Sequence, residues 1–144
     1  MIRCVQAVYL LDLVDARKTP HSGRTLFEHL FKTCGLLESM GASKEVCMAG
    51  AFHSIYGTTV FKHKSLGIEE RPLVRYVIGE RAERLAYLFC RASRPFATFR
   101  EGKTYYLTTV DGDEEVTKEE LHKLTLIAAA NCFEQILAKK KATN

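Results

Sequence analysis

The chain has 144 residues, of which 47% are apolar and 26% charged, as in an ordinary packed domain rather than a disordered one. Its net charge of +4 comes partly from the C-terminal AKKKATN, so it does not favour a nucleic-acid-binding protein. No apolar run approaches the roughly 18 residues of a membrane span. We therefore expect a single domain over residues 1–144, with residues 138–144 forming a flexible basic tail.

The cysteines indicate a reducing compartment. Their number is odd, no pair has a Cys-x-x-Cys spacing, and four of the five lie in helix-like apolar runs, which is typical of reduced core residues. The N-terminal segment shows no signal-peptide cleavage site. We expect a cytoplasmic protein without a membrane segment.

Helical patterns dominate the first half of the chain. Residues 5–14 fit a helical face imperfectly, and TPHSGR at 19–24 is typical of a loop. TLFE at 25–28 is a capping box, and apolar residues recur at helical spacing from there until Gly41. A further helix, begun after Ser43 and apolar nearly all round, is expected to reach Ile55 as the central buried helix.

The second half predicts more helix and one β-hairpin. Residues 69–95 indicate two helices separated near Gly79, the second ending before Pro95. Residues 97–113 alternate, and Glu101-Gly102 can form a turn, so a hairpin is expected. A capping box, TKEE at 117–120, begins a long last helix. The predicted fold is mostly α, with a small β-hairpin inserted before the last long helix.

Two histidines are expected to meet. His29 lies about 12 residues before Gly41 and His53 about 12 residues after it. Because antiparallel helices joined by a short turn bring the start of one beside the end of the other, the two imidazoles should lie at the same level.

These segments resemble the HD-domain superfamily, and within it most closely the alarmone (ppGpp) hydrolases. The matching stretches are TLFEHL, AGAFHS and LIAAANCFEQI. The resemblance implies an HD-domain-like helical bundle in which His29 and His53 correspond to metal-binding histidines. Ser54 and Asn131 then replace the family's two metal-binding aspartates, and Gly57-Thr58 replaces its acidic pair. Alarmone hydrolysis is therefore not expected.

Three interpretations of this histidine site remain open. The site can hold one divalent metal (Zn, Fe or Mn) through His29 and His53, with His21, Glu83 or Glu134 completing the ligand set. Alternatively, the two histidines are a metal-free acid/base pair and further polar residues bind the substrate. The expected substrate-binding residues are Ser54, Tyr56, Gly57, Thr58, Asn131 and Arg71. In the third interpretation, the histidines and their polar neighbours only satisfy one another in the core.

The favoured function is a small divergent HD-like enzyme acting on a small polar molecule by lyase, isomerase or hydrolase chemistry. The alternative is a non-catalytic protein that binds a small ligand or a partner in the same pocket. The expected partner is a small-molecule substrate or ligand, with no nucleic acid and no membrane. Homo-oligomerisation through the aromatic hairpin TFREGKTYY at 98–106 is compatible with either function.

Overall fold

A computed structural model describes residues 9, 11–12 and 15–143, so the helix predicted over residues 5–14 lies mostly outside the described residues. The described helices are α2 (Leu26–Ser39), α3 (Lys44–Ala51), α4 (Arg71–Ile78), α5 (Glu80–Arg91) and α6 (Lys118–Ala142), with a 3-10 turn η1 (Ile68–Glu70). The described strands are β1 (Pro20–His21), β2 (Arg24–Thr25), β3 (Thr98–Glu101), β4 (Thr104–Thr109) and β5 (Gly112–Val116).

Local capping residues set where the long helices begin. The Thr25 hydroxyl accepts the Glu28 amide at the start of α2, and the Ser43 hydroxyl accepts the Val46 amide at the start of α3. At the start of α6, Thr117 and Glu120 form a complete capping box. These contacts satisfy amides that have no partner within the helix.

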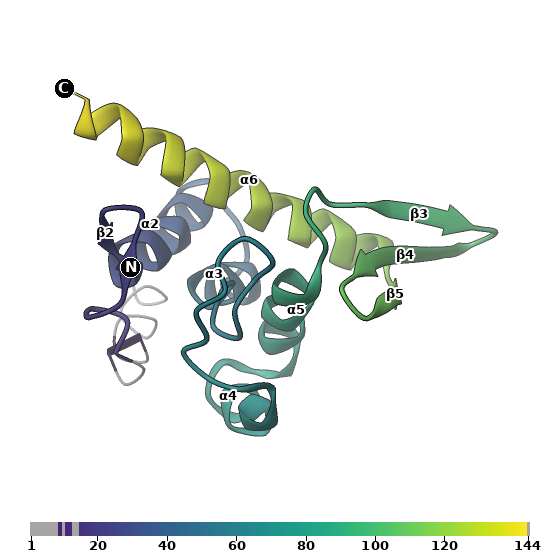
Figure 1. The fold of residues 1–144 in the computed structure, drawn as a ribbon. Coiled ribbons are helices and arrows are strands. Elements are labelled where there is room, and N and C mark those ends of the chain that lie inside the picture. Colours follow the sequence, from purple (N-terminus) through teal and green to yellow (C-terminus); the bar gives the residue numbers. More distant parts are fainter. Residues whose placement is uncertain (1–8, 10, 13–14, 144) are drawn as a thin grey trace.

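The core lies where α6 crosses the other helices. Figure 1 shows α6 running over α2, α3 and α5, with α4 on the far side of α5. The side chains packed at these crossings are apolar and fully buried, among them Leu30, Leu37, Cys47, Leu85 and Ile127. Burial of this surface is the main force that holds the helices together.

Two antiparallel sheets accompany the helices, and they make the predicted fold class wrong. The strands β1 and β2 pair around Ser22 and Gly23, both at positive φ, and β3, β4 and β5 form a three-stranded sheet in that order. Helices make up 55% and strands 15% of the molecule, so the fold is mixed α+β rather than an HD-domain-like helical bundle with one small hairpin. Two-residue strands and the charged β5 (GDEEV) lack the apolar alternation by which strands are predicted.

Two boundaries also differ from the prediction. The helix expected to reach Ile55 ends at Ala51, so His53 lies in the turn that follows α3. Residues 138–142, expected in a flexible tail, form the end of α6. Lysine side chains there stabilise the helix because the C-terminal end of the helix dipole is negative. Among the described helices, none combines the length and the apolar character that crossing a membrane requires.

Candidate functional site

His29 and His53 face each other inside the molecule. The ring centroids are 5.0 Å apart and the two Nε2 atoms 3.2 Å apart. Only 1% of His29 and 3% of His53 is exposed. The predicted proximity of these two imidazoles is therefore confirmed, although His53 is presented by a turn rather than by a helix.

The shortest contact of the opposite nitrogen of each ring is with a group that can only accept a hydrogen bond, although Arg24 Nη2 also lies 3.4 Å from His29 Nδ1. His53 Nδ1 lies 2.6 Å from the Gly50 carbonyl oxygen, and His29 Nδ1 lies 2.5 Å from Glu134 Oε1. A carbonyl and an ionised carboxylate have no hydrogen to donate, so both Nδ1 atoms must carry one. A neutral imidazole has a single N–H, which leaves each Nε2 as an acceptor.

Burial keeps this pair neutral at physiological pH. Desolvation, together with the nearby His29 and Arg94, lowers the pKa of His53 to about 3. Desolvation also lowers the pKa of His29, and Glu134 offsets this only in part. Two lone pairs therefore point toward each other across 3.2 Å, an arrangement that a proton or a donor group of a ligand would stabilise.

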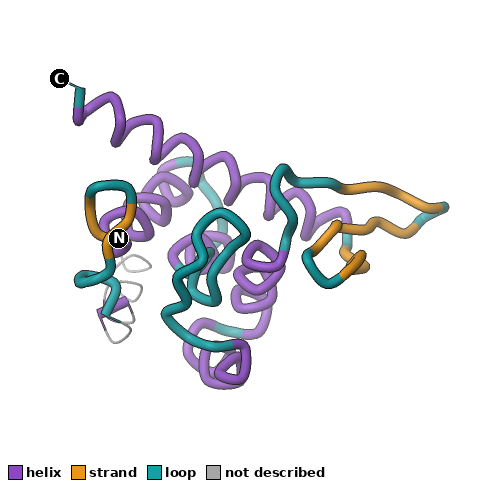
Figure 2. The backbone as a smooth tube through the Cα atoms, viewed as in Figure 1, coloured by secondary structure: helices purple, strands orange, loops and turns teal. Residues whose placement is uncertain are grey.

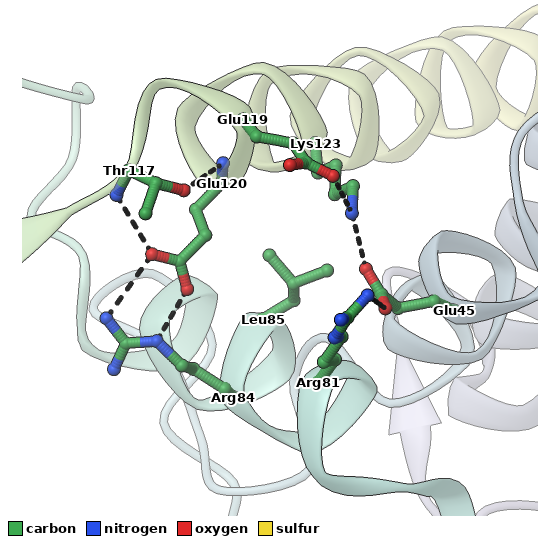
Figure 3. A pocket seen from close by; sticks show the side chains of 8 residues that line it. All are labelled: Glu45, Arg81, Arg84, Leu85, Thr117, Glu119, Glu120 and Lys123. Atoms are coloured by element: carbon green, nitrogen blue, oxygen red, sulfur yellow. Dashed lines mark hydrogen bonds and ion pairs between the residues drawn. The ribbon is translucent and has the colours of Figure 1, made fainter.

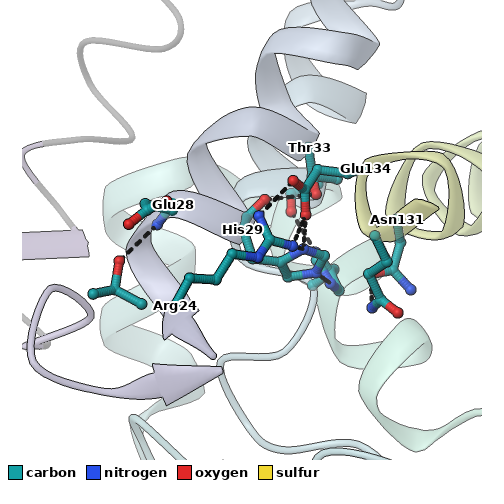
Figure 4. Close-up of polar contacts among 10 residues, drawn as sticks. Arg24, Glu28, His29, Thr33, Asn131 and Glu134 are labelled. Carbon is teal, nitrogen blue, oxygen red and sulfur yellow. Dashed lines mark hydrogen bonds and ion pairs between the residues drawn. The ribbon is translucent and has the colours of Figure 1, made fainter. Parts of the chain in front are cut away.

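Glu134 and Arg24 hold His29 in place from two further elements. Glu134 projects from α6 and accepts hydrogen bonds through both oxygens from Arg24, which lies on β2; Arg24 Nη1 is 2.5 Å from Glu134 Oε2 (Figure 4). Burial favours the neutral acid, but hydrogen bonds from Arg24 and His29 outweigh it and lower the pKa of Glu134. The carboxylate therefore stays ionised and orients the His29 ring.

Polar atoms without partners border the histidine pair. The ring of His21, predicted as a loop residue, is buried and stacks on His29 with 4.4 Å between centroids. Desolvation and its neighbour His29 lower the pKa of His21 to about 4. Within the described residues, His21 Nδ1 and Ser54 Oγ are buried without a hydrogen-bond partner. Such atoms are rare in native proteins and are found at functional sites.

Asn131 joins the site from α6, as expected. Its side chain lies close to His29 and acts to raise the pKa of that histidine. Gln135, one turn further along the same helix, donates to Asn131 Oδ1 over 3.3 Å. In Figure 4, Asn131 lies on the side of His29 away from Arg24.

Tyr56 and Arg71, expected to bind substrate, belong to a different buried network. Both donate to the Glu83 carboxylate, at 2.9 Å from the Tyr56 hydroxyl and 2.8 Å from Arg71 Nε. Arg75 adds a third donor at 3.1 Å, and the Arg71 guanidinium stacks on Tyr87. Their polar groups are already engaged, so this network is a structural one.

Gly57 and Thr58 form a tight turn. Gly57 has a φ of +80°, and a Cβ there would lie 3.1 to 3.3 Å from atoms of residues 62–64. The Thr58 amide donates to the Phe61 carbonyl, and its hydroxyl accepts the Phe61 amide. The sequence pattern alone does not separate this turn from a ligand-binding loop.

The donor set does not fit the metal that the HD resemblance implies. No group of three or more His, Cys, Asp or Glu side chains that could hold a metal ion exists in the described part of the chain. Both oxygens of Glu134 are bound to Arg24, and Ser54 and Asn131 supply no negative charge. Neutral oxygens are weak substitutes for the two missing carboxylates. We therefore derive no metal-dependent step.

A second charged cluster joins α3, α5 and α6 but is mutually satisfied. Arg84 binds Glu120 at 2.5 Å, and Lys123 binds both Glu45 and Glu119 around the cavity of Figure 3. Its cations are paired with carboxylates, so these ion pairs hold the three helices together. The paired charges leave no free charged group at this cavity to bind a ligand.

Arg24 was absent from the predicted site, and Glu134 entered it only as a possible metal ligand. They are 110 residues apart in the sequence, and although Glu134 lies in the stretch LIAAANCFEQI, no sequence pattern links it to Arg24. His21, likewise expected only as a possible metal ligand, lies on a two-residue strand that has no recognisable sequence pattern. Only the folded chain brings these three side chains to His29.

Comparison with known proteins places the chain in a family. Residues 10–94 match the model of the family described as Domain of unknown function (DUF6817). That segment contains both histidines, Arg24 and the Glu83 network, and excludes α6. No curated protein and no solved structure matches the chain. Because the match covers more than half of its residues, the protein belongs to the DUF6817 family.

Proposed function

We propose that the protein is a small enzyme that acts on a small polar molecule, with His29 and His53 as its acid/base pair. The observation that carries this proposal is the pair of Nε2 atoms 3.2 Å apart, each with its Nδ1 held by an acceptor. Two neutral imidazoles arranged in this way have room for one more proton. A substrate O–H or N–H can supply it, which is general-base catalysis.

The surroundings of the two rings suit a transient proton. Glu134 stabilises the positive charge that His29 acquires, and the Gly50 carbonyl keeps the His53 ring in one tautomer. Because burial disfavours the charged form, the proton is readily returned to a leaving group or to a neighbouring carbon. Proton removal followed by proton return is common to lyases, isomerases and hydrolases.

The HD-domain relationship stays a proposal about ancestry. It is supported by the positions of His29, His53 and Asn131 in the sequence. The mixed α+β fold and the contact between His29 of α2 and Glu134 are not part of that resemblance. Because Ser54, Asn131, Gly57 and Thr58 replace acidic residues of that superfamily, the proposed reaction is not alarmone hydrolysis.

A non-catalytic ligand-binding protein is the second candidate. It is favoured by the unpartnered polar atoms of His21 and Ser54, which a bound molecule would satisfy without any reaction. The two candidates involve the same histidine cluster and differ in whether a proton is transferred.

Turnover in a screen of small polar compounds tests the proposal. His53→Gln and His29→Gln should each lower a detected rate by about 10² or more, the usual contribution of a general base. His122→Gln, at an exposed position on α6, is the matched control and should keep full activity. Unchanged turnover in His53→Gln would refute the acid/base pair. Binding of a compound that depends on His53 without turnover would favour the second candidate.

A further inference from the structure

Arg94, which follows α5, lies in an unusual aromatic setting next to the histidine pair. Its guanidinium carbon is 4.3 Å from the Phe89 ring centroid and 4.6 Å from the Phe96 ring centroid. The Phe89 ring is in turn 5.1 Å from the His53 ring. A single aromatic ring therefore connects the guanidinium to the candidate site.

The charge of Arg94 is not balanced. No Asp or Glu among the described residues forms an ion pair with it, and its Nη1 is buried without a hydrogen-bond partner. Nη2 reaches only the Phe89 carbonyl, at 3.5 Å. Desolvation lowers the pKa of Arg94, with Cys90 and Cys132 opposing. An unpaired cation in such a place is energetically costly.

Each of the other half-buried arginines of the described chain forms an ion pair with a carboxylate. Arg24 pairs with Glu134, Arg71 with Glu83, Arg84 with Glu120 and Arg91 with Asp111. Arg94 is the exception among them, and its charge contributes to lowering the pKa of His53. An anion at the edge of the histidine site would supply the partner that Arg94 lacks.

We propose that Arg94 binds the anionic group of the molecule that His29 and His53 act on, and that this molecule is a small carboxylate. The inference deepens the proposed function and rests on it. A carboxylate is planar and carries one negative charge, which matches one guanidinium fork between two aromatic rings. A phosphate dianion would need a second unpaired cation, and the nearby Arg24 is already bound to Glu134.

Titration with benzoate, a flat carboxylate, tests the inference, with benzamide as the uncharged probe of the same shape and inorganic phosphate as the alternative anion. Binding is measured by NMR on the side chains of Arg94, His29 and His53. Benzoate should shift all three, whereas benzamide and phosphate should bind more weakly. Arg94→Gln should weaken benzoate binding by about 10-fold or more, the worth of a hydrogen-bonded charge.

Two variants make the result specific. Arg100→Gln removes the same charge from an exposed position on β3 and should leave benzoate affinity unchanged. Arg94→Lys keeps the charge without the fork and should weaken benzoate binding to an intermediate degree. Equal benzoate affinity in wild type and Arg94→Gln would overturn the inference. Tighter binding of phosphate than of benzoate would also overturn it, as would benzoate binding that shifts the Arg94 signals but those of neither histidine.

The same titration separates this inference from the proposed function. His53→Gln should still bind benzoate through Arg94, because the guanidinium is retained, even though turnover is lost. If His53→Gln keeps full turnover while Arg94→Gln loses benzoate binding, the acid/base proposal fails and the anion site stands. If turnover depends on His53 but benzoate binding does not depend on Arg94, only the carboxylate proposal fails.

Discussion

At the scale of single residues, buried titratable side chains gather around His29 and His53. His21, His29 and His53 are all at least nine-tenths buried and lie in one cluster. Glu134 is buried beside them, and positive charge comes from Arg24 near His29 and from Arg94 near His53. Such concentration of titratable groups with shifted pKa values is characteristic of functional sites.

Acid should therefore destabilise the fold before any carboxylate is protonated. In the folded protein the pKa of His53 is lowered to about 3 and that of His21 to about 4, from an ordinary value of 6.5. The unfolded state binds more protons below pH 6.5, so the stabilisation is complete above that pH and is lost as the pH falls toward the folded values. Each histidine contributes up to about 1.4 kcal/mol per pH unit.

Urea unfolding at pH 7 and pH 5 measures this dependence, since Asp and Glu remain largely ionised between these values. His53→Gln should reduce by about one the number of protons that the chain takes up on unfolding at pH 5, and so make the dependence of stability on pH shallower. His122→Gln, on the exposed face of α6, should leave it as in wild type. Equal stability of the wild-type protein at both pH values would contradict the buried, neutral state of the cluster.

At the scale of elements, α4 and α5 are joined by the Glu83 network rather than by a large apolar contact. Val74 is the only buried residue of α4, and the exposed Leu73 and Tyr76 point away from the core. Glu83 of α5 is fully buried and accepts hydrogen bonds from Arg71 and Arg75 of α4. The position of α4 thus depends on one carboxylate.

Glu83→Gln should accordingly lower the free energy of unfolding by about 3 kcal/mol, because it leaves two arginines without a counter-charge. Glu114→Gln is the control, since Glu114 is half-exposed and lies 3.7 Å from Arg84, a contact worth at most about 1 kcal/mol. Chemical denaturation of both variants measures the difference. Similar stabilities would show that the network is dispensable.

At the scale of the whole molecule, α6 completes both the core and the site. It covers α2, α3 and α5 (Figure 1). It also supplies Asn131 and Glu134 to the histidine pair. The family match ends at residue 94, well before this helix. The matched segment by itself therefore lacks the residues of α6 that complete the hydrophobic core.

Truncation separates the parts of α6 that matter. A chain ending at Thr117 should lose cooperative thermal unfolding, because the surface buried by Leu124 and Ile127 becomes exposed to water. A chain ending at Ala138 keeps Glu134 and removes only residues at the exposed end of α6, so it should unfold near the wild-type temperature. Circular dichroism melts of both chains measure this. A cooperative transition in the shorter chain would show that α6 is an addition to a self-sufficient domain.

Short-range patterns in the sequence were sufficient for part of this result. The capping boxes at Thr25 and Thr117 correctly placed the starts of α2 and α6, because a cap involves residues only three positions apart. The equal spacing of His29 and His53 about Gly41 correctly predicted that the two rings meet. The caps and the antiparallel path of α2 and α3 follow from helix geometry, which depends on neighbours along the chain, and His53 lies only two residues beyond the end of α3.

Contacts between distant segments decided the rest. The fold class was predicted wrongly because the short β1 and β2 and the charged β5 are held by pairing with other strands rather than by their own patterns. Arg24 and Glu134 meet His29 from opposite ends of the chain, and whether an arginine is paired or unpaired depends entirely on what the fold places beside it. Electrostatic interactions act through space, so the charges around the histidine pair and the isolation of Arg94 were set by tertiary packing alone.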